Sequence, residues 1–188
     1  MQLGSPPGMP LPVRRLLDDR AMARALQRMA SEIVERAGGT SDLVLVGIQR
    51  RGVELADRLS ALIERDHGPV RSGKLDITLY RDDLQAIGPR PVVGETRLPD
   101  GLDDSTVVIV DDVLYTGRTV RAALDEFADF GRPRRILLCI LVDRGGRELP
   151  IHPDITGLQV STGPGDRVDV SVRELDGVDA VDLVRGDG

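Results

Sequence analysis

The sequence predicts an α/β fold, in which a parallel β-sheet carries helices on both faces and a small antiparallel β addition follows near the C-terminus. Three segments, at 43–48, 106–112 and 134–142, each contain a continuous apolar run, which is typical of a strand buried on both faces of a parallel sheet. Segments with helical spacing alternate with these runs, as in βαβ units. Apolar and polar residues alternate strictly at 167–172, which predicts the antiparallel addition.

Two amphipathic helices are predicted in the first third of the chain. The first covers 18–37, with Asp18 as its N-cap and Gly38 directly after its last residue. The second covers 52–65. Apolar residues recur at helical spacing in both, namely Met22, Leu26, Met29, Ile33 and Val34 in the first and Val53, Leu55, Ala56, Leu59, Leu62 and Ile63 in the second.

The middle of the chain contains a strand, a long connection and a third helix. Residues 74–80 alternate between apolar and polar and predict a strand. Residues 81–105 are charged, rich in Gly and Pro, and without a clear period. Because a connection this long inside a compact domain is usually functional, we expect a flexible loop beside a site. The third helix is predicted at 118–130.

Length and composition limit the function classes. The 188 residues predict one domain at 13–188, preceded by a mobile extension at 1–12 that is rich in Pro and Gly. With 31 acidic and 25 basic residues the net charge is −6, which argues against broad nonspecific nucleic-acid binding. Cys139 is the single cysteine and lies in an apolar run, so we expect a buried thiol. No membrane span or signal peptide is evident, and a cytoplasmic location is expected.

The most informative segment is 106–123, TVVIVDDVLYTGRTVRAA. An apolar strand ends in Asp111 and Asp112, and a short hydroxylated loop then leads into a helix. A helix N-terminus leaves backbone N–H groups without intrahelical partners and carries about half a positive charge, so it stabilises a phosphate group. Thr116 and Thr119 add hydroxyl donors, and Gly117 lets the backbone approach closely.

The acidic pair completes a site for a sugar phosphate. Carboxylates at a strand end accept hydrogen bonds from ribose hydroxyls and hold hydrated Mg2+, which prefers carboxylate and water ligands. The alternative is an ordinary surface turn between a strand and a helix. This alternative is disfavoured because adjacent Asp residues at the end of an apolar strand repel each other and destabilise the fold unless a ligand uses them.

Five segments together resemble one family. The segment around Asp111 resembles the 5-phosphoribosyl-1-pyrophosphate (PRPP) motif of type I phosphoribosyltransferases. With V-G-I-Q-R-R-G at 46–52, L-D-I-T-L-Y-R-D-D at 75–83, G-R-P at 131–133 and L-V-D-R-G-G-R-E-L-P-I at 141–151, it resembles the bifunctional pyrimidine-operon regulators and uracil phosphoribosyltransferases, the PyrR family.

The resemblance implies a type I phosphoribosyltransferase fold and the reaction of uracil with PRPP to give UMP and pyrophosphate, with Mg2+ as cofactor. It also implies UMP-dependent binding of a pyrimidine leader RNA that promotes transcription termination, and a homodimer or homotetramer is expected. Expected catalytic residues are Asp111, Asp112, Arg51 and Arg81. Expected PRPP- or UMP-binding residues are Arg50, Arg51, Val110, Asp111, Asp112, Val113, Leu114, Tyr115, Thr116, Gly117, Arg118 and Thr119. Expected base-binding residues are Val142, Asp143 and Arg144.

The predicted RNA surface departs from the family pattern. Positions where family members carry His, Arg, Lys and His are here Gly146, His152, Leu158 and Ser31. Arg28 and Arg147 remain as candidate RNA contacts. Because phosphate contacts supply much of the affinity for nucleic acid, the sequence predicts weak RNA binding.

Three functions stay open from the sequence. The first is an active enzyme that also regulates through RNA, and the second is an enzyme with a reduced RNA role. The third is a nucleotide sensor that keeps the PRPP pocket without catalysis. The retained Arg51, Asp111 and Asp112 argue against the third. A purine base such as hypoxanthine as substrate is disfavoured by the segment at 141–151.

Overall fold

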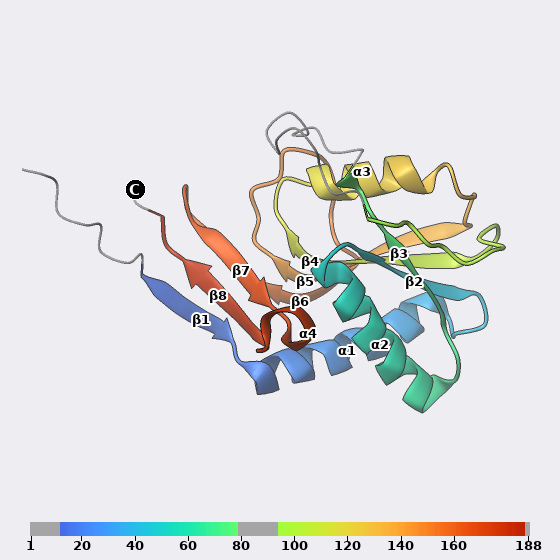
Figure 1. Cartoon of the computed structure of the whole chain (residues 1–188), viewed down its shortest axis with the longest axis horizontal. Helices are drawn as coiled ribbons and strands as arrows, with labels where there is room; N and C mark the ends of the chain where they lie inside the picture. The colour runs from blue at the N-terminus through green and yellow to red at the C-terminus, as the bar shows by residue number, and fades with distance from the viewer. Residues whose placement is uncertain (1–11, 79–93, 187–188) are drawn as a thin grey trace, which may run out of the picture.

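A five-stranded parallel sheet in the order β3-β2-β4-β5-β6 forms the centre of the molecule (Figure 1). The structure is a computed structural model that describes residues 12–78 and 94–186. The strands are β2 (Leu43–Ile48), β3 (Arg71–Leu75), β4 (Thr106–Leu114), β5 (Arg135–Asp143) and β6 (Ile155–Gln159). This arrangement confirms the predicted parallel α/β sheet.

Helices cover both faces of this sheet. Helices α1 (Asp19–Ala37) and α2 (Arg51–His67) pack on one face, and α3 (Arg118–Phe127) packs on the other. Strand β2 shows why its sequence is continuously apolar. Its Leu43 and Leu45 belong to the core under α1 and α2, whereas Val44, Val46 and Ile48 belong to the core under α3.

A second, antiparallel sheet has the order β1-β8-β7. It consists of β1 (Val13–Leu17), β7 (Arg167–Ser171) and β8 (Ala180–Val184), and the short helix α4 (Arg173–Asp176) follows β7. We call these four elements the hood; they lie together beside α1 and α2 in Figure 1. The predicted antiparallel addition is confirmed, although the sequence analysis identified neither β1 nor β8, nor β6 in the central sheet.

The helix boundaries follow local capping. Asp18 accepts a 2.7 Å hydrogen bond from the N–H of Ala21, and Gly38 ends α1 with φ 76°, both as predicted. Helix α3 is shorter than predicted, because the chain leaves the helix after Phe127 and forms a turn. Phe130, which was expected inside the helix, is 47% exposed and has no place in the core.

The prediction of a strand at 74–80 is wrong in the position of the strand. Strand β3 starts earlier and ends at Leu75. The N–H of Asp76 then donates to Thr96 Oγ1 at 3.0 Å, and its carboxylate accepts from the N–H of Thr78 at 2.9 Å. These local bonds turn the chain out of the sheet, because a side-chain partner replaces the next strand contact.

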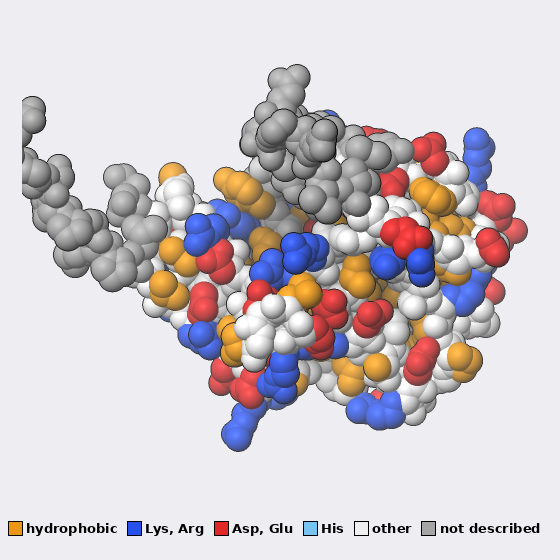
Figure 2. Space-filling model, in the orientation of Figure 1, with side chains coloured by type: hydrophobic (Ala, Val, Ile, Leu, Met, Phe, Trp, Pro, Cys, Tyr) orange, Lys and Arg blue, Asp and Glu red, His pale blue; other side chains and the backbone are white. Residues whose placement is uncertain are grey.

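Most other sequence expectations for the core and surface hold. Cys139 is fully buried, as expected. Acidic and basic side chains are intermixed over the face shown in Figure 2. Within the described part of the chain no helix is long and apolar enough to cross a membrane. The extension expected at 1–12 lies outside the described residues except for Pro12.

Two glycines let α2 lie unusually close to the sheet. A Cβ on Gly47 would stand 2.5 Å from the carbonyl oxygen of Gly52 and from the Cα of Val53. A Cβ on Gly52 would stand 2.5 Å from the carbonyl oxygen of Val110. The absence of both side chains therefore brings the N-terminus of α2 against β2 and β4, immediately beside Asp111.

We predict that Gly47→Ala destabilises the protein by about 1–3 kcal/mol, since the added methyl group meets backbone atoms that cannot rotate away. Urea denaturation of the purified variant measures this effect. Gly163→Ala is the matched control, because a Cβ there has its nearest neighbour, Asp166 Oδ2, at an ordinary 3.5 Å. Equal stability of the two variants would show that the close approach of α2 is not required.

Candidate functional site

The candidate site lies where the carboxyl ends of β2, β4 and β5 meet at one edge of the parallel sheet. In open α/β sheets this edge is where ligands bind. Strand β2 leads through Gln49 and Arg50 into α2, and β4 leads through Tyr115–Gly117 into α3. Two helix N-termini and three strand ends thus converge, and they carry the residues that the sequence singled out.

The acidic pair lies inside β4, two residues before the strand ends. Asp111 is 7% exposed, and its Oδ1 accepts a 2.9 Å hydrogen bond from the N–H of Asp112. Asp112 is less buried, and its Oδ1 accepts from the N–H of Val113 at 2.8 Å. Burial, and secondly the charge of Asp112, raise the pKa of Asp111 well above its ordinary value.

The consequence is an electrostatic strain that a cation relieves. Two neighbouring carboxylates, one of them buried, are unfavourable when both are ionised. A bound cation or a developing positive charge on a sugar ring would lower the pKa of Asp111 and stabilise the ionised pair. Among the residues that the structure describes, no group of three or more His, Cys, Asp or Glu side chains is placed to hold a metal ion.

The loop between β4 and α3 has the geometry of a phosphate-binding turn. Gly117 precedes α3 with φ 94°, a conformation that favours glycine. The N-cap residue Gly117 has no side chain that could bond the first turn, and a helix N-terminus is where backbone N–H groups bind an anion. Thr116 Oγ1 accepts from the N–H of Arg118 at 3.3 Å, which places this hydroxyl group at the helix entrance.

The segment after β5 braces this loop from the side. The N–H groups of Glu148 and Leu149 both donate to the carbonyl oxygen of Thr116, at 3.0 and 3.1 Å. The N–H of Arg144 donates to the carbonyl oxygen of Leu114 at 3.1 Å. The phosphate loop and the expected base-binding segment are therefore one hydrogen-bonded unit.

Arg147 and Asp143 form a nearly buried ion pair inside this unit. Their side chains are 16% and 9% exposed, with 2.7 Å between Nη2 of Arg147 and Oδ2 of Asp143. The same guanidinium donates to the carbonyl oxygens of Tyr115 at 3.0 Å and Ile151 at 2.8 Å. These bonds all lie within the chain, and they lend no support to the RNA contact expected of Arg147. Asp143 was expected to bind the base, but its carboxylate pairs with Arg147 and accepts a hydrogen bond from the N–H of Gly145.

Arg144 links the phosphate loop to the segment between β6 and β7. Its Nη2 donates to the carbonyl oxygen of Asp166 at 2.6 Å, and its Nε donates to Thr162 Oγ1 at 3.2 Å. Its guanidinium lies over the ring of Tyr115, 4.0 Å from the ring centroid, as a cation–π contact. Because the residue is 9% exposed, this position fits a structural role at least as well as direct contact with a base.

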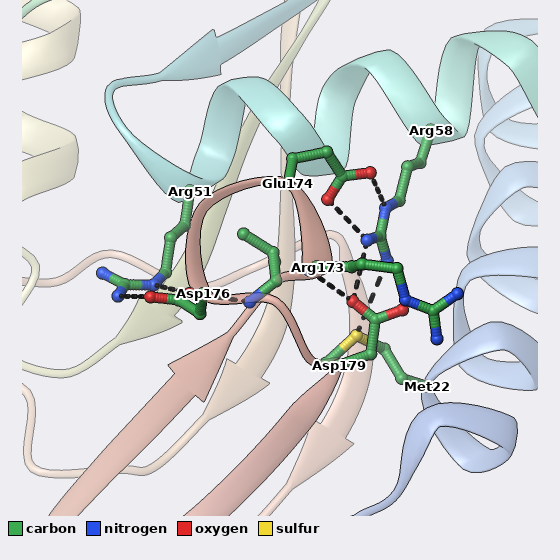
Figure 3. A network of polar contacts seen from close by, with 8 residues as sticks. Met22, Arg51, Arg58, Arg173, Glu174, Asp176 and Asp179 are labelled. Atoms are coloured by element: carbon green, nitrogen blue, oxygen red, sulfur yellow. Dashed lines mark hydrogen bonds and ion pairs between the residues drawn. The ribbon is translucent and has the colours of Figure 1, made fainter.

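The turn between β2 and α2 presents two arginines. The peptide bond between Gln49 and Arg50 is cis, and the Arg50 residue is exposed. Arg51 forms a double hydrogen bond with Asp176 of α4, with Nη2 to Oδ1 at 2.9 Å and Nε to Oδ2 at 3.2 Å (Figure 3). The sequence analysis missed Asp176, because no local pattern marks a carboxylate that lies 125 positions from its partner.

The structure thus brings together most of the predicted residues. The acidic pair, the phosphate loop, Arg50 and Arg51 lie at one edge of the sheet, with Val142 and Asp143 at the end of the neighbouring strand. Val110 and Val142 are fully buried in the core, so their side chains are not exposed at this edge. Arg81, expected to be catalytic, lies outside the described residues.

We predict that Asp111→Asn raises the thermal unfolding temperature at neutral pH. Asn keeps the acceptor for the N–H of Asp112 and removes a charge that is costly to bury. The pKa of Asp111 is raised by folding, so its destabilising effect is absent at acidic pH and grows as pH rises through the ordinary carboxyl range toward the raised value.

Thermal melts of wild type and variant across this range measure the effect. The stabilising effect of Asp111→Asn should be largest near neutral pH and should shrink as the pH falls. A variant that is less stable than wild type at neutral pH would mean that the buried charge is compensated within the protein.

Comparisons with a family model and with known proteins agree with one another. Residues 12–172 match the family model described as phosphoribosyl transferase domain. The chain is 55% identical over 174 residues to the bifunctional protein PyrR of Chloroflexus aurantiacus, which covers 92% of this chain and 96% of that protein. Identity to the bifunctional protein PyrR of Clostridioides difficile is 53% over 170 residues, with 90% and 96% covered.

A solved structure agrees at the level of the fold. A hypoxanthine-guanine phosphoribosyltransferase from Bacillus anthracis superposes with a TM-score of 0.69 over 94% of this chain and 99% of that chain. Its sequence identity is 15%, so the likeness concerns the arrangement of strands and helices and not the substrate.

Proposed function

This chain belongs to the phosphoribosyl transferase domain family and, within it, to the bifunctional PyrR proteins, and from that membership we propose that it transfers the phosphoribosyl group of PRPP to N1 of uracil. The products are UMP and pyrophosphate. The observation that carries this proposal is the acidic pair of β4, with Asp111 buried, followed directly by a braced phosphate loop at the N-terminus of α3.

Charge complementarity assigns a part of PRPP to each end of this segment. The 5′-phosphate fits the turn at Thr116 and Gly117, where backbone N–H groups and a hydroxyl group converge on the helix N-terminus. The ribose then lies over the acidic pair, whose carboxylates accept hydrogen bonds from the sugar hydroxyls. As the bond to pyrophosphate lengthens, positive charge develops on the sugar ring, and the carboxylates stabilise it.

The leaving pyrophosphate is negatively charged, so it requires positively charged groups on the side of the ribose away from the acidic pair. Arg51, and Arg50 beside it, lie at the N-terminus of α2 and are the proposed pyrophosphate contacts. The proposed role of Mg2+ is to neutralise the pyrophosphate oxygens, held through water near Asp111 and Asp112. The carboxylates fit this role, because Mg2+ prefers few protein ligands together with substrate phosphates.

Uracil itself is the nucleophile, so the protein needs no nucleophilic side chain. Its contribution is to position the two substrates and to stabilise charge. The base is proposed to lie beside the end of β5, at Val142, Asp143 and Arg144. Because the side chains of Asp143 and Arg144 are engaged within the chain, backbone groups of this segment are the proposed readers of the base edge.

The direct test is formation of UMP from uracil, PRPP and Mg2+ by purified protein. Replacing both Asp111 and Asp112 by Asn should lower kcat/KM by about 10²-fold or more, because the charge that stabilises the sugar cation is removed while the shape is kept. Asp169→Asn in the hood strand β7 is the control and should retain full activity.

Alternative functions give different results in the same assay. Turnover with hypoxanthine in place of uracil would contradict the proposed base. UMP binding by the wild type without turnover would identify the chain as a nucleotide sensor. Unchanged turnover in the double variant would show that the acidic pair has another role.

We further propose that RNA binding by this chain is weaker than its family membership suggests. A Cβ on Gly146 would stand 2.3 Å from Cε2 of Tyr115, so the ring occupies space that a larger residue there would need. Arg28, the other candidate RNA contact, donates its Nη2 to the carbonyl oxygen of Gly157. The two arginines expected to bind RNA therefore both have partners within the chain.

A gel-shift experiment with the pyrimidine leader RNA, with and without UMP, measures this affinity. We expect weak binding that requires UMP and decreases steeply as the salt concentration rises, since few phosphate contacts remain. Nanomolar, sequence-selective binding would show that other side chains replace the missing contacts.

A further inference from the structure

The hood is fastened to α2 by a cluster of ion pairs (Figure 3). Arg58 of α2 donates to both carboxylate oxygens of Glu174 in α4, from Nε at 2.9 Å and from Nη2 at 2.6 Å. Its Nη2 also donates to Oδ1 of Asp179 at 2.7 Å. Asp179 also accepts from the N–H of Arg173 at 2.8 Å. Helix α4 is therefore fixed along the N-terminal half of α2, which also carries Arg51.

Asp176 of α4 is itself held in place. Its Oδ2 accepts a 2.8 Å hydrogen bond from the N–H of Val172, and the same carboxylate bonds to Arg51. The N–H of Val172 and then Arg51 lower the pKa of Asp176, so this group remains ionised at neutral pH. Arg51 thus has a fixed, charged partner that comes from a different part of the fold.

Among the described residues, Arg51 bonds through its side chain only to Asp176, and this pair leaves one edge of the guanidinium open. Asp176 uses Nε and Nη2, which form the side of the planar group. The other edge, made by Nη1 and the second hydrogen of Nη2, points away from α4 in Figure 3. A guanidinium has five N–H donors in fixed directions, so it can bind a carboxylate on one edge and a phosphate group on another.

We propose that Asp176 is a positioning residue for the transfer reaction: it holds the Nε edge of Arg51 so that the Nη1–Nη2 edge is directed at the pyrophosphate of PRPP. This inference rests on the proposed role of Arg51 as a pyrophosphate contact. An arginine side chain has many rotamers, and fixing it before the ligand arrives removes an entropic cost from binding. The effect should therefore appear in the binding of PRPP and not in the chemical step.

The first test replaces Asp176 by Asn, which keeps an acceptor for the N–H of Val172 and removes the charge. We expect KM for PRPP to rise roughly tenfold, with kcat and KM for uracil nearly unchanged. Glu174→Gln is the matched control, because it weakens the contact of α4 with Arg58 but does not touch Arg51. Its KM for PRPP should stay within about twofold of wild type.

A double-mutant cycle with Arg51→Gln separates positioning from general loosening of the hood. If Asp176 acts through Arg51, Asp176→Asn has no further effect on KM for PRPP once Arg51 is replaced. A rise that persists in the Arg51→Gln background would overturn the proposal, because the effect would then not pass through the guanidinium.

The outcomes also distinguish this inference from the proposed function. If Arg51→Gln raises KM for PRPP strongly and Asp176→Asn leaves it unchanged, the pyrophosphate role stands and the positioning role is wrong. A lower KM for PRPP in Asp176→Asn would mean that Asp176 competes with pyrophosphate, which also overturns it. If Arg51→Gln has no effect, the pyrophosphate role and the inference both fail.

A second variant covers the case in which Asp176→Asn does not fold. Arg51→Lys keeps the positive charge and leaves Asp176 intact, but an ammonium group lacks two separate edges for two anions. We expect its KM for PRPP to rise by a factor similar to that of Asp176→Asn. An unchanged KM would show that a simple charge is sufficient and that directed orientation of the guanidinium is not needed.

Discussion

The burial of Asp111 beside Asp112 is the constraint on which the rest of the site depends. A buried carboxylate with a charged neighbour is unfavourable in the free protein, and the pKa of Asp111 is raised accordingly. The surroundings maintain this burial: Gly47 and Gly52 let α2 approach closely, and a Cβ on Gly52 would stand 3.4 Å from Oδ1 of Asp111. The negative charge is thereby kept next to the place where a cationic sugar would form.

The opposite charge is supplied by helix ends and fixed guanidinium groups. The N-terminus of α3 is suited to the 5′-phosphate, and Arg51 at the start of α2 is suited to pyrophosphate. Several charged residues near these groups serve to build the site. Arg147, Asp143 and Arg144 hold the phosphate loop to the segment after β5 and to the segment between β6 and β7. Such bracing matters, because catalysis by positioning loses about 10²-fold in rate when the reacting groups are displaced by about 1 Å.

Sequence patterns predicted the parts of this molecule that local chemistry determines. The buried strands, the Asp18 cap of α1 and the motif at 106–123 all follow from neighbours in the chain. The pairing of Arg51 with Asp176 and the use of Arg147 inside the fold depend on residues brought together by the tertiary structure. The predicted end of β3 was wrong because the N–H of Asp76 donates to Thr96, twenty positions away, and this hydrogen bond overrides the local alternation of apolar and polar residues. Strands β1 and β8 were missed because each is short and is defined by pairing between the two ends of the chain.

Proton release on binding of Mg2+ and PRPP tests the central claim most directly. If the ligand relieves the strain at the acidic pair, it lowers the pKa of Asp111, and the wild type releases a proton that Asp111→Asn cannot release. Calorimetry in two buffers of different ionisation enthalpy, at the same mildly acidic pH, counts these protons, and the variant corrects for protons released by PRPP itself. We expect the wild type to release more protons than the variant. Equal release by both proteins would contradict the account.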